Sequence, residues 1–233
     1  MQHANRTQWY QANETYWRDG GYGGTTDDEA MIGDTGGVQD GGEGLAFLDR
    51  LLRDRRCNNN KTNQAIDAGA GVGRVTKHVL LKRYDSVQLV EADSGWSKQS
   101  RNYLGRKRSA KCTFTCARLE DLDVPTMLES SADLVWLQWT LQYLTDRDAV
   151  IVLRKLASCL VKDTGFLIVK ENRPYGGARV DRFQMETPEC SGRYDITRTD
   201  NHHRLLFQRA GLAVDRVEEG VETHTYALVV VSL

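Results

Sequence analysis

The sequence predicts a doubly wound α/β fold with a seven-stranded, mostly parallel sheet that ends in an antiparallel hairpin. Three observations support this fold class. Apolar runs of strand length alternate with amphipathic segments of helix length through the middle of the chain, as in parallel sheets with right-handed crossovers. A glycine-rich turn at 69–73 lies between the first such strand and a helix. The last two apolar runs, 212–217 and 223–231, are separated only by Glu218 to Glu222, which is short enough for a hairpin.

The N-terminal part differs in composition from the rest of the chain. Residues 7–17 carry aromatic side chains at helical spacing and are predicted to form a helix that packs on the main domain. The Gly- and Asp-rich stretch 19–44 is predicted to be a long loop with little regular structure, which marks either a functional lid or a disordered segment. We therefore divide the chain into an N-terminal helix and glycine-rich lid segment at 1–44 and a main domain at 45–233, which opens with an amphipathic helix.

The core of the main domain follows from the alternation of strand-length and helix-length segments. Strands are expected at 64–68, 86–91, 112–116, 132–138 and 165–170. Helices are expected at 74–82, 95–104, 146–160 and 198–210. The hairpin at the C-terminal end then completes the sheet.

Composition limits the classes of function. At 233 residues, with 40% hydrophobic and 27% charged residues, the chain is an ordinary globular protein of one α/β domain with appendages. A formal net charge of -1 argues against a nucleic-acid partner held mainly by phosphate attraction, although a local basic patch stays compatible with it. No apolar run is long enough to cross a membrane, and residues 1–6 open no apolar segment typical of signal peptides. We expect a monomer without a membrane or nucleic-acid partner.

The cysteines indicate a reducing compartment. They are scattered and odd in number: Cys57, Cys112, Cys116, Cys159 and Cys190. This usage is typical of reduced thiols, so the expected location is the cytoplasm, the nucleus or both. Cys112 and Cys116 would face the same side of a strand, but zinc needs two further ligands and none is evident nearby. We therefore expect no metal.

The glycine turn predicts a cofactor site. Its three glycines, Gly69, Gly71 and Gly73, permit positive φ angles and close approach of a ligand. Glu91 ends the next apolar run, where a carboxylate can accept hydrogen bonds from two ribose hydroxyls. Dinucleotide sites usually read Gly-x-Gly-x-x-Gly, because the pyrophosphate rests on a helix N-terminus. Here the spacing is Gly-x-Gly-x-Gly with Asp67 before it, and an acid suits an ammonium and repels a pyrophosphate. A turn whose glycines serve only packing is the alternative.

This combination of turn and acids resembles class I S-adenosylmethionine (SAM) methyltransferases, which have a Rossmann-like fold. The resemblance implies SAM as the cofactor and S-adenosylhomocysteine as its product. An NAD-dependent oxidoreductase is the cross-class alternative, which the glycine spacing disfavours. A non-enzymatic partner protein of the same fold would usually lack the glycines or the ribose acid, and both are present here.

Further motifs are similar to those of one family, the protein N-terminal α-amine methyltransferases, which act on Xaa-Pro-Lys/Arg N-termini. The similarity spans about residues 7 to 230. The motifs are Tyr16-Trp17, Asp67 to Lys77, Trp136-Leu137-Gln138-Trp139 and Val169-Lys170-Glu171-Asn172. The Trp-x-Gln-Trp and Lys-Glu-Asn motifs are specific, because methyltransferases in general lack them. A SAM enzyme for a small-molecule amine or another acceptor is the main alternative, and a nucleic-acid methyltransferase would need a basic face or an Asn-Pro-Pro-Tyr-type motif.

The resemblance implies roles for three sets of residues. The cofactor would contact Trp17, Gly69, Gly71, Arg74, Glu91, Leu119 and Gln138. The N-terminal segment of a substrate protein would contact Tyr16, Trp139, Tyr143, Asn172 and Asp181. The candidate catalytic residues are Asp181, Asn172 and Asp195. Each set lies near the carboxyl end of a strand or in the N-terminal segment, where ligands of open α/β sheets bind.

Purely structural roles stay open for several of these residues. Trp136 fits a core position, and Gln138 fits an amide that caps the backbone. Asn172 precedes Arg173-Pro174, where a turn residue is common, and Asp181 fits a solvated loop acid.

The chain departs from the family pattern at two places. Tyr143 stands where the family often has a histidine that is a candidate proton acceptor, and tyrosine titrates near 10 in model peptides. Residues 173–193 include extra residues, which puts the position of a second family aspartate in doubt; Asp195 is the nearest candidate. We therefore expect Asp181 or Asp195 to accept the proton of the substrate amine, directly or through water.

Overall fold

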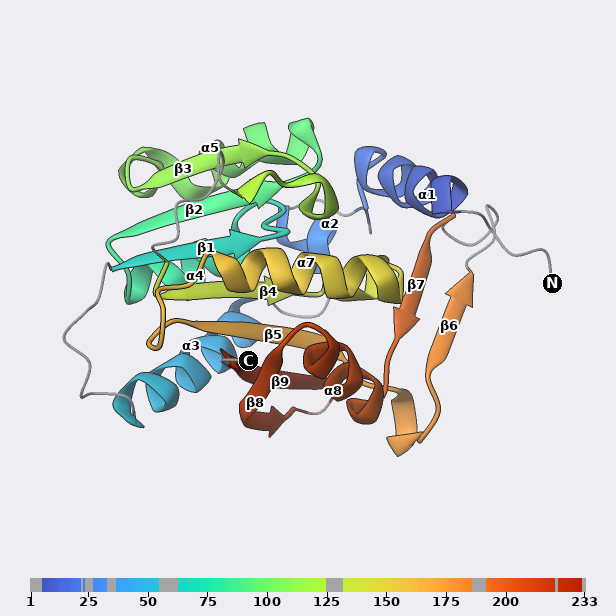
Figure 1. Cartoon of the computed structure of the whole chain (residues 1–233). Coiled ribbons are helices and arrows are strands. Elements are labelled where there is room, and N and C mark those ends of the chain that lie inside the picture. Colours follow the sequence, from blue (N-terminus) through green and yellow to red (C-terminus); the bar gives the residue numbers. More distant parts are fainter. Residues whose placement is uncertain are drawn as a thin grey trace.

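A seven-stranded sheet forms the centre of the computed structural model (Figure 1). The structure describes residues 6–21, 23, 27–32, 37–54, 63–124, 132–185, 192–220 and 222–231. The strands of the sheet are β1 (Gln64–Ala68), β2 (Ser86–Glu91), β3 (Cys112–Cys116), β4 (Leu134–Gln138), β5 (Phe166–Asn172), β8 (Leu212–Glu219) and β9 (Thr223–Val230). Their order across the sheet is β3-β2-β1-β4-β5-β9-β8.

Strand directions confirm the predicted fold class. β1 to β5 pair in parallel, β9 pairs antiparallel with β5, and β8 pairs antiparallel with β9. All five residues of β4 are buried, as expected for a central strand covered on both faces. The carboxyl ends of the parallel strands therefore meet at one edge of the sheet, beside β1, where the strand order reverses.

Helices cover both faces of this sheet. They are α1 (Arg6–Arg18), α2 (Asp27–Ile32), α3 (Gly37–Asp54), α4 (Arg74–His78), α5 (Ser94–Ser109), α7 (Asp146–Ser158) and α8 (Asp200–Arg209). Short 3-10 turns are η1 (Leu80–Lys82), η2 (Leu119–Asp121), η3 (Leu141–Tyr143) and η4 (Tyr175–Gly177). Side chains of β4 alternate between two cores: Val135 and Leu137 pack with α7 and α8, whereas Leu134 and Trp136 pack with α3, α4 and α5. Trp136 is therefore a core residue.

The predicted long loop at 19–44 is wrong at 27–32 and 37–44, because α2 and the first turns of α3 lie there. Glycine has a low helix propensity, and packing overrides it here. A Cβ atom at Gly41 would lie 2.7 Å from the Cβ of His78, and one at Gly44 would lie 3.3 Å from the ring of Trp136. These glycines thus let α3 approach α4 and β4 closely. The predicted domain boundary after residue 44 falls inside α3, and residues 22, 24–26 and 33–36 lie outside the described residues.

The extra residues after β5 form part of a second, two-stranded sheet that was not predicted. Its strands are β6 (Arg182–Met185) and β7 (Tyr194–Thr197), which pair antiparallel, and residues 186–191 between them lie outside the described part of the chain. Figure 1 shows this small sheet beside α1, at the carboxyl edge of the main sheet. Tyr194 stacks on Trp9 of α1, with ring centroids 5.2 Å apart, and donates its backbone N–H to Oδ1 of Asn13. The small sheet and α1 therefore form one wall.

Hydrogen bonds to one buried carboxylate join α1 to α7. Asp148 accepts hydrogen bonds from Arg6, from the hydroxyl of Tyr10 at 2.7 Å and from the hydroxyl of Thr145 at 2.8 Å. Trp9 and Tyr10 are buried, which confirms the predicted aromatic packing face of this helix. The opposite end of α1 carries Tyr16 and Trp17 towards the carboxyl edge of the sheet.

Two further properties concern membranes and metals. None of the described helices is long and apolar enough to cross a membrane. Among the described residues, no three His, Cys, Asp or Glu side chains form a group that could hold a metal ion. Cys112, Cys116 and Cys159 are free thiols, while Cys57 and Cys190 lie outside the described residues.

Candidate active site

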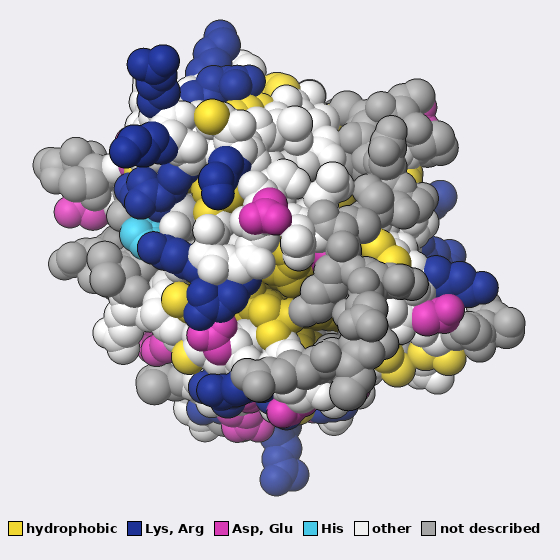
Figure 2. Space-filling view, turned by 90° about the vertical axis from the view of Figure 1, so that its left-hand side faces the viewer, with side chains coloured by type: hydrophobic (Ala, Val, Ile, Leu, Met, Phe, Trp, Pro, Cys, Tyr) yellow, Lys and Arg dark blue, Asp and Glu magenta, His cyan; other side chains and the backbone are white. Residues whose placement is uncertain are grey.

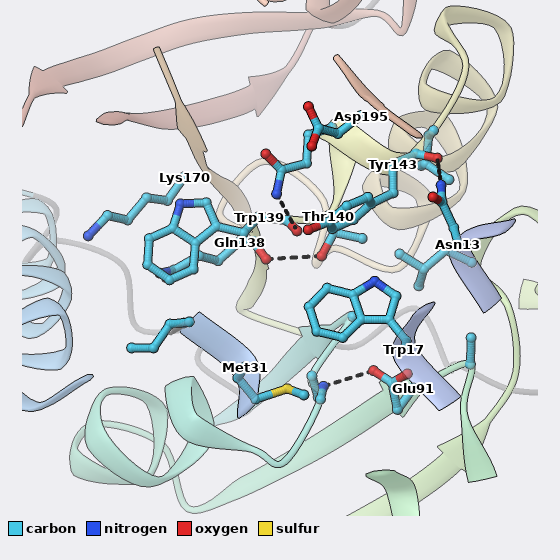
Figure 3. Close-up of a pocket in the computed structure, with 18 of the residues that line it drawn as sticks. Asn13, Trp17, Met31, Glu91, Gln138, Trp139, Thr140, Tyr143, Lys170 and Asp195 are labelled. Carbon is cyan, nitrogen blue, oxygen red and sulfur yellow. Dashed lines mark hydrogen bonds between the residues drawn. The ribbon is translucent and has the colours of Figure 1, made fainter. Parts of the chain in front are cut away.

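A cavity of about 1100 Å³ opens at the carboxyl ends of β1, β2, β4 and β5 (Figure 3). The N-terminal helices, the start of α5, residues 117–120 and β7 also contribute to its walls. Eleven of the predicted site residues line it: Trp17, Gly69, Gly71, Arg74, Glu91, Leu119, Gln138, Trp139, Tyr143, Asn172 and Asp195. Two others, Tyr16 and Asp181, do not. Residues distant in the sequence thus converge on one site.

The glycine turn has the conformation that its sequence predicts. Gly69, Gly71 and Gly73 have φ angles of 70°, 53° and 83°, which side-chain-bearing residues rarely adopt. Space is limiting as well: a Cβ atom at Gly69 would lie 2.4 Å from Oγ1 of Thr140, and one at Gly71 would lie 2.5 Å from the sulfur of Met31. The backbone of the turn can therefore face the cavity directly.

Glu91 lies beside this turn at the end of β2. Its carboxylate accepts the backbone N–H of Gly71 at 2.8 Å and that of Asp93 at 2.9 Å. Burial raises the pKa of Glu91, and these N–H donors oppose the shift. Each carboxylate oxygen has two lone pairs, so both oxygens retain capacity for a further donor such as a ribose hydroxyl.

A buried ionic cluster lies on the other side of the turn. The carboxylate of Asp40, on α3, binds the guanidinium of Arg74 and, at 2.5 Å, the ammonium of Lys170. The side-chain amide of Gln138 donates to the same carboxylate at 3.0 Å, while its oxygen accepts the indole N–H of Trp136 at 3.0 Å. Although burial opposes it, the two cations lower the pKa of Asp40. Gln138 therefore positions side chains around the cavity rather than capping the backbone.

Trp139 has a strained backbone where it enters the cavity. Its φ angle is 50°, a conformation that is costly for a bulky residue and is often found at functional sites. The cations Arg74 and Lys170 lie over its ring, 5.1 Å and 6.0 Å from the centroid. Its indole N–H is buried, and no described group accepts a hydrogen bond from it. This donor is available to a ligand.

Glu171 supports the peptide that follows Trp139. Its buried carboxylate accepts the backbone N–H groups of Thr140 at 2.8 Å and Leu141 at 2.7 Å. Burial raises the pKa of Glu171 to about 7 despite these donors. The buried carboxyl group of Glu171 near the end of β5 thus shapes the loop that carries the cavity residues.

Stability should therefore depend on the protonation of Glu171. Its carboxyl holds a proton in the folded protein up to about pH 7 but loses it near 4.5 when unfolded, so unfolding releases a proton between these values. We expect the free energy of unfolding to fall by about 2–3 kcal/mol from pH 5 to pH 8 through this group. Glu171→Gln should remove that part of the slope in urea titrations. An unchanged slope in the variant would contradict the assignment.

Trp17 separates the two halves of the cavity. Figure 3 shows its ring between Glu91 on one side and Thr140 and Tyr143 on the other. The ring makes an edge contact with that of Tyr143, with centroids 5.6 Å apart. Its backbone carbonyl accepts the indole N–H of Trp96 at 2.8 Å, which ties the end of α1 to α5. Trp17 thus lines both halves of the cavity: the one that contains the glycine turn and the one bounded by η3.

The second half of the cavity holds Asp195, which lies on β7. Asp195 is buried, and its Oδ2 accepts a hydrogen bond from Nε of Arg193 at 3.2 Å. Arg193 also donates to the hydroxyl of Tyr16 at 2.9 Å, and its guanidinium lies 5.0 Å from the centre of that ring. Tyr16 is therefore one residue removed from the cavity wall, where it orients the arginine that binds Asp195.

The structure places Asp181 outside the cavity wall. This exposed carboxylate accepts the N–H and the hydroxyl of Thr199 at 2.7 Å and 2.9 Å, and Nδ1 of His202 lies 2.7 Å from it. Burial opposes the shift, but these partners lower the pKa of Asp181. Its contacts join β6 to the start of α8, and the role predicted for it in proton transfer stays a prediction.

Two further predicted residues, Asn172 and Tyr143, lie at or beside η3, while Leu119 lies on η2. Asn172, at the end of β5, donates to the side-chain oxygen of Gln142 at 3.2 Å. The backbone carbonyl of Tyr143 accepts the indole N–H of Trp9 at 2.6 Å and the amide of Asn13 at 3.4 Å. Tyr143 therefore lies on a short turn that is held by α1 through Trp9 and Asn13 and by the end of β5 through Asn172.

Sequence reasoning missed several residues of the site. Asp40 and Met31 lie in the stretch predicted to be a loop. Lys170 and Glu171 belong to a family motif, but no role in the site was predicted for them. Their signal was present: two charged residues, Lys170 and Glu171, follow directly on the apolar run 166–169. Buried charges of this kind require partners, which marks them for attention.

Comparison with known proteins identifies the family. A family model described as AdoMet-dependent proline di-methyltransferase matches residues 5–229. The chain belongs to this family. The cofactor of this SAM-dependent methyltransferase is thus the one that the glycine turn indicated.

Curated relatives agree with the family match. The chain is 31% identical to alpha N-terminal protein methyltransferase 1 of Arabidopsis thaliana, over 92% of this chain and 74% of the relative. It is also 31% identical to N-terminal Xaa-Pro-Lys N-methyltransferase 1 of Bos taurus, over 89% of this chain and 86% of the relative.

Solved structures agree as well. A SAM-dependent methyltransferase from Leishmania major has a TM-score of 0.71 and 27% identity, covering 95% of this chain and 82% of that one. The magnesium protoporphyrin IX methyltransferase of Synechocystis, solved with bound SAM, has a TM-score of 0.63 at 16% identity and covers 99% of this chain and 100% of that one. This second likeness concerns the fold alone.

The residues of the cavity fit SAM. The turn without Cβ atoms leaves room for a nucleoside, and the carboxylate of Glu91 can take hydrogen bonds from ribose hydroxyls. Arg74 and Lys170 are cations suited to the carboxylate of the amino-acid part, near the unpaired indole N–H of Trp139. The donor and acceptor set of this methyltransferase therefore matches the two ends of its cofactor.

Proposed function

We propose that this methyltransferase transfers methyl groups to the α-amine of protein N-termini that begin Xaa-Pro-Lys/Arg. The observation that carries the proposal is the second half of the cavity, beyond Trp17. It is bounded by Tyr143 and Asp195, which lie on the far side of Trp17 from Glu91, and Asn172 also lines the cavity and contacts Gln142 beside Tyr143. The relatives named for Xaa-Pro-Lys N-termini support the substrate class.

SAM supplies an electrophilic methyl group when bound. The amine must be neutral to accept it, because an ammonium has no lone pair. An α-amine has a pKa near 8, so part of it is neutral at pH 7, and burial beside aromatic rings favours the neutral form further.

Asp195 is the proposed proton acceptor. It lines the substrate half, is buried, and is oriented by Arg193, which Tyr16 holds in turn. A carboxylate so placed can accept the proton directly or through a water molecule. Tyr143 would serve as a wall against Trp17 rather than as a base. Asn172 would orient the substrate through its side-chain amide, which already points to Gln142 on η3.

Labelled SAM and short peptides test the substrate class. We expect transfer of label to Ser-Pro-Lys and Ala-Pro-Lys peptides with a free N-terminus, and no transfer to the same peptides after N-terminal acetylation. Transfer that survives acetylation would point to a side-chain acceptor and would contradict the proposal. A small primary amine that competes as well as the peptide would favour the small-molecule alternative.

The scattered free thiols support a cytoplasmic or nuclear location for this enzyme. The monomeric state expected from the sequence is also a proposal, which light scattering can test.

A further inference from the structure

The surface of α5 carries a concentration of positive charge that the methyltransferase site does not use. Six cations lie between residues 98 and 111, and no Asp or Glu occurs from residue 94 to residue 119. The six are Lys98, Arg101, Arg106, Lys107, Arg108 and Lys111, which we call the α5 basic surface. All six are exposed, in a chain whose formal net charge is only -1. Figure 2 shows Lys and Arg side chains gathered along one edge of the face at the left of Figure 1.

These cations are not neutralised by neighbouring carboxylates. Among the described residues, none of the six makes an ion pair, whereas Arg83 on the adjoining η1–β2 connection pairs with Asp49. Arg101 lies over the ring of Phe114 on β3, 3.9 Å from its centroid, and Lys77 of α4 lies 3.7 Å from the centroid of Tyr103. The α5 basic surface therefore adjoins Lys77 of α4 and Phe114 of β3, and cations cover the two aromatic rings beside it.

The chemistry of the α5 basic surface excludes an apolar partner. The exposed large apolar side chains of the described residues are Tyr175, Val180, Leu205, Val230 and Val231, and none is on α5 or β3. Protein interfaces need a buried apolar or aromatic centre, and helices that lie in a membrane surface need an apolar face. The apolar face of α5 is already used, because Trp96 and Leu104 are buried in the enzyme's own core.

Length and covered rings favour a duplex over a single strand. The cations on α5 itself, from Lys98 to Arg108, span about 15 Å at the helical rise per residue, over which one strand of DNA presents about four phosphates. Single strands are usually held by exposed aromatic rings on which bases stack, and here Phe114 and Tyr103 lie under cations. Contacts from Lys and Arg to phosphate oxygens carry no sequence information.

We propose that the α5 basic surface binds the phosphate backbone of double-stranded DNA without sequence preference. This departs from the expectation of no nucleic-acid partner, which rested on the net charge of the whole chain. α5 begins at the cavity, which Ser94 and Trp96 line, whereas Arg106 to Lys111 lie beyond its kink at Gly105. None of the six cations lines the cavity, so DNA bound on them leaves the cavity open and the enzyme can act on a peptide while attached to DNA.

Salt-dependent binding tests this proposal. Fluorescence anisotropy with a labelled 20-base-pair duplex should give micromolar dissociation constants at 50 mM NaCl that weaken about 10³-fold by 200 mM. The slope of log affinity against log salt should be about -5 and should become less steep by about 3 in the triple variant Arg106→Ala, Lys107→Ala, Arg108→Ala. The control is Arg147→Ala, Lys162→Ala, Arg209→Ala, which removes the same charge from exposed residues elsewhere and should keep the wild-type slope.

Four outcomes would overturn the proposal. They are no binding at 50 mM NaCl, an equal loss in both triple variants, tighter binding of single-stranded DNA, and tighter binding of polyglutamate, which would indicate an acidic protein partner. Peptide methylation should be unchanged in the α5 triple variant, because none of its three residues lines the cavity. The two proposals are thus tested separately: DNA binding can be absent while peptide methylation is present, and peptide methylation can be absent while DNA binding is present.

Discussion

Asp195→Asn should lower the turnover number for a Xaa-Pro-Lys peptide by about 10²–10⁴-fold, the usual contribution of a general base. The affinity for SAM should change less than twofold, since Glu91 and the glycine turn hold the other half of the cavity. The amide keeps the size of the carboxylate and removes its ability to accept a proton. Rates measured with labelled SAM and affinities measured by calorimetry check both statements.

Asp181→Asn is the matched control for this experiment. Its carboxylate binds Thr199 and His202 outside the cavity, so we expect less than a tenfold change in turnover. If Asp181 instead accepts the proton, the two variants exchange their effects. A loss of SAM binding in Asp195→Asn equal to its loss of turnover would contradict a role confined to the substrate half.

Gly69→Ala should abolish measurable SAM binding at concentrations that saturate the wild type. The new Cβ atom would lie 2.4 Å from Oγ1 of Thr140, and φ is 70°, so the turn or Thr140 must shift at the wall of the cavity. Left-handed backbone at an alanine costs about 1 kcal/mol even without a clash. Thermal unfolding and calorimetry with SAM measure the two effects separately.

Gly105→Ala separates backbone strain from the clash. Gly105 has a φ of 72°, but no described atom lies within 4 Å of its added Cβ, and it does not line the cavity. We expect at least as large a loss of stability from strain alone, because its ψ of 160° lies in a region essentially restricted to glycine, with SAM affinity unchanged. Equal losses of SAM affinity at both positions would mean that the turn at 69–73 acts only through global stability.

Local sequence patterns were sufficient to predict the main sheet and its turns. The five parallel strands, the glycine turn and the final hairpin follow from apolar runs bounded by turn residues. The helix predicted at 74–82 instead breaks at Val79, whose backbone is not helical, into α4 and η1. The helix predicted at 95–104 continues past Gly105 to Ser109, across a kink.

Features that depend on distant contacts were not predicted. α3 begins at Gly37 because Gly41 and Gly44 fit against His78 and Trp136, which is visible only in three dimensions. Asp40 lies 130 residues from Lys170 in the sequence, so no local pattern could join them. The pairing of β6 with β7 likewise spans residues outside any recognisable motif.

The ionic cluster around Asp40 bears on how the chain divides into domains. In the intact protein the side chains of Arg74 and Lys170 are only 7% and 3% exposed, and both pair with Asp40. If the chain were cut after residue 44, these two cations would lose the carboxylate that they share. Buried cations left without a partner are strongly unfavourable. The N-terminal segment is therefore an integral layer of the fold: its Asp40 neutralises Arg74 of α4 and Lys170 of β5, and neither part forms a complete cavity by itself.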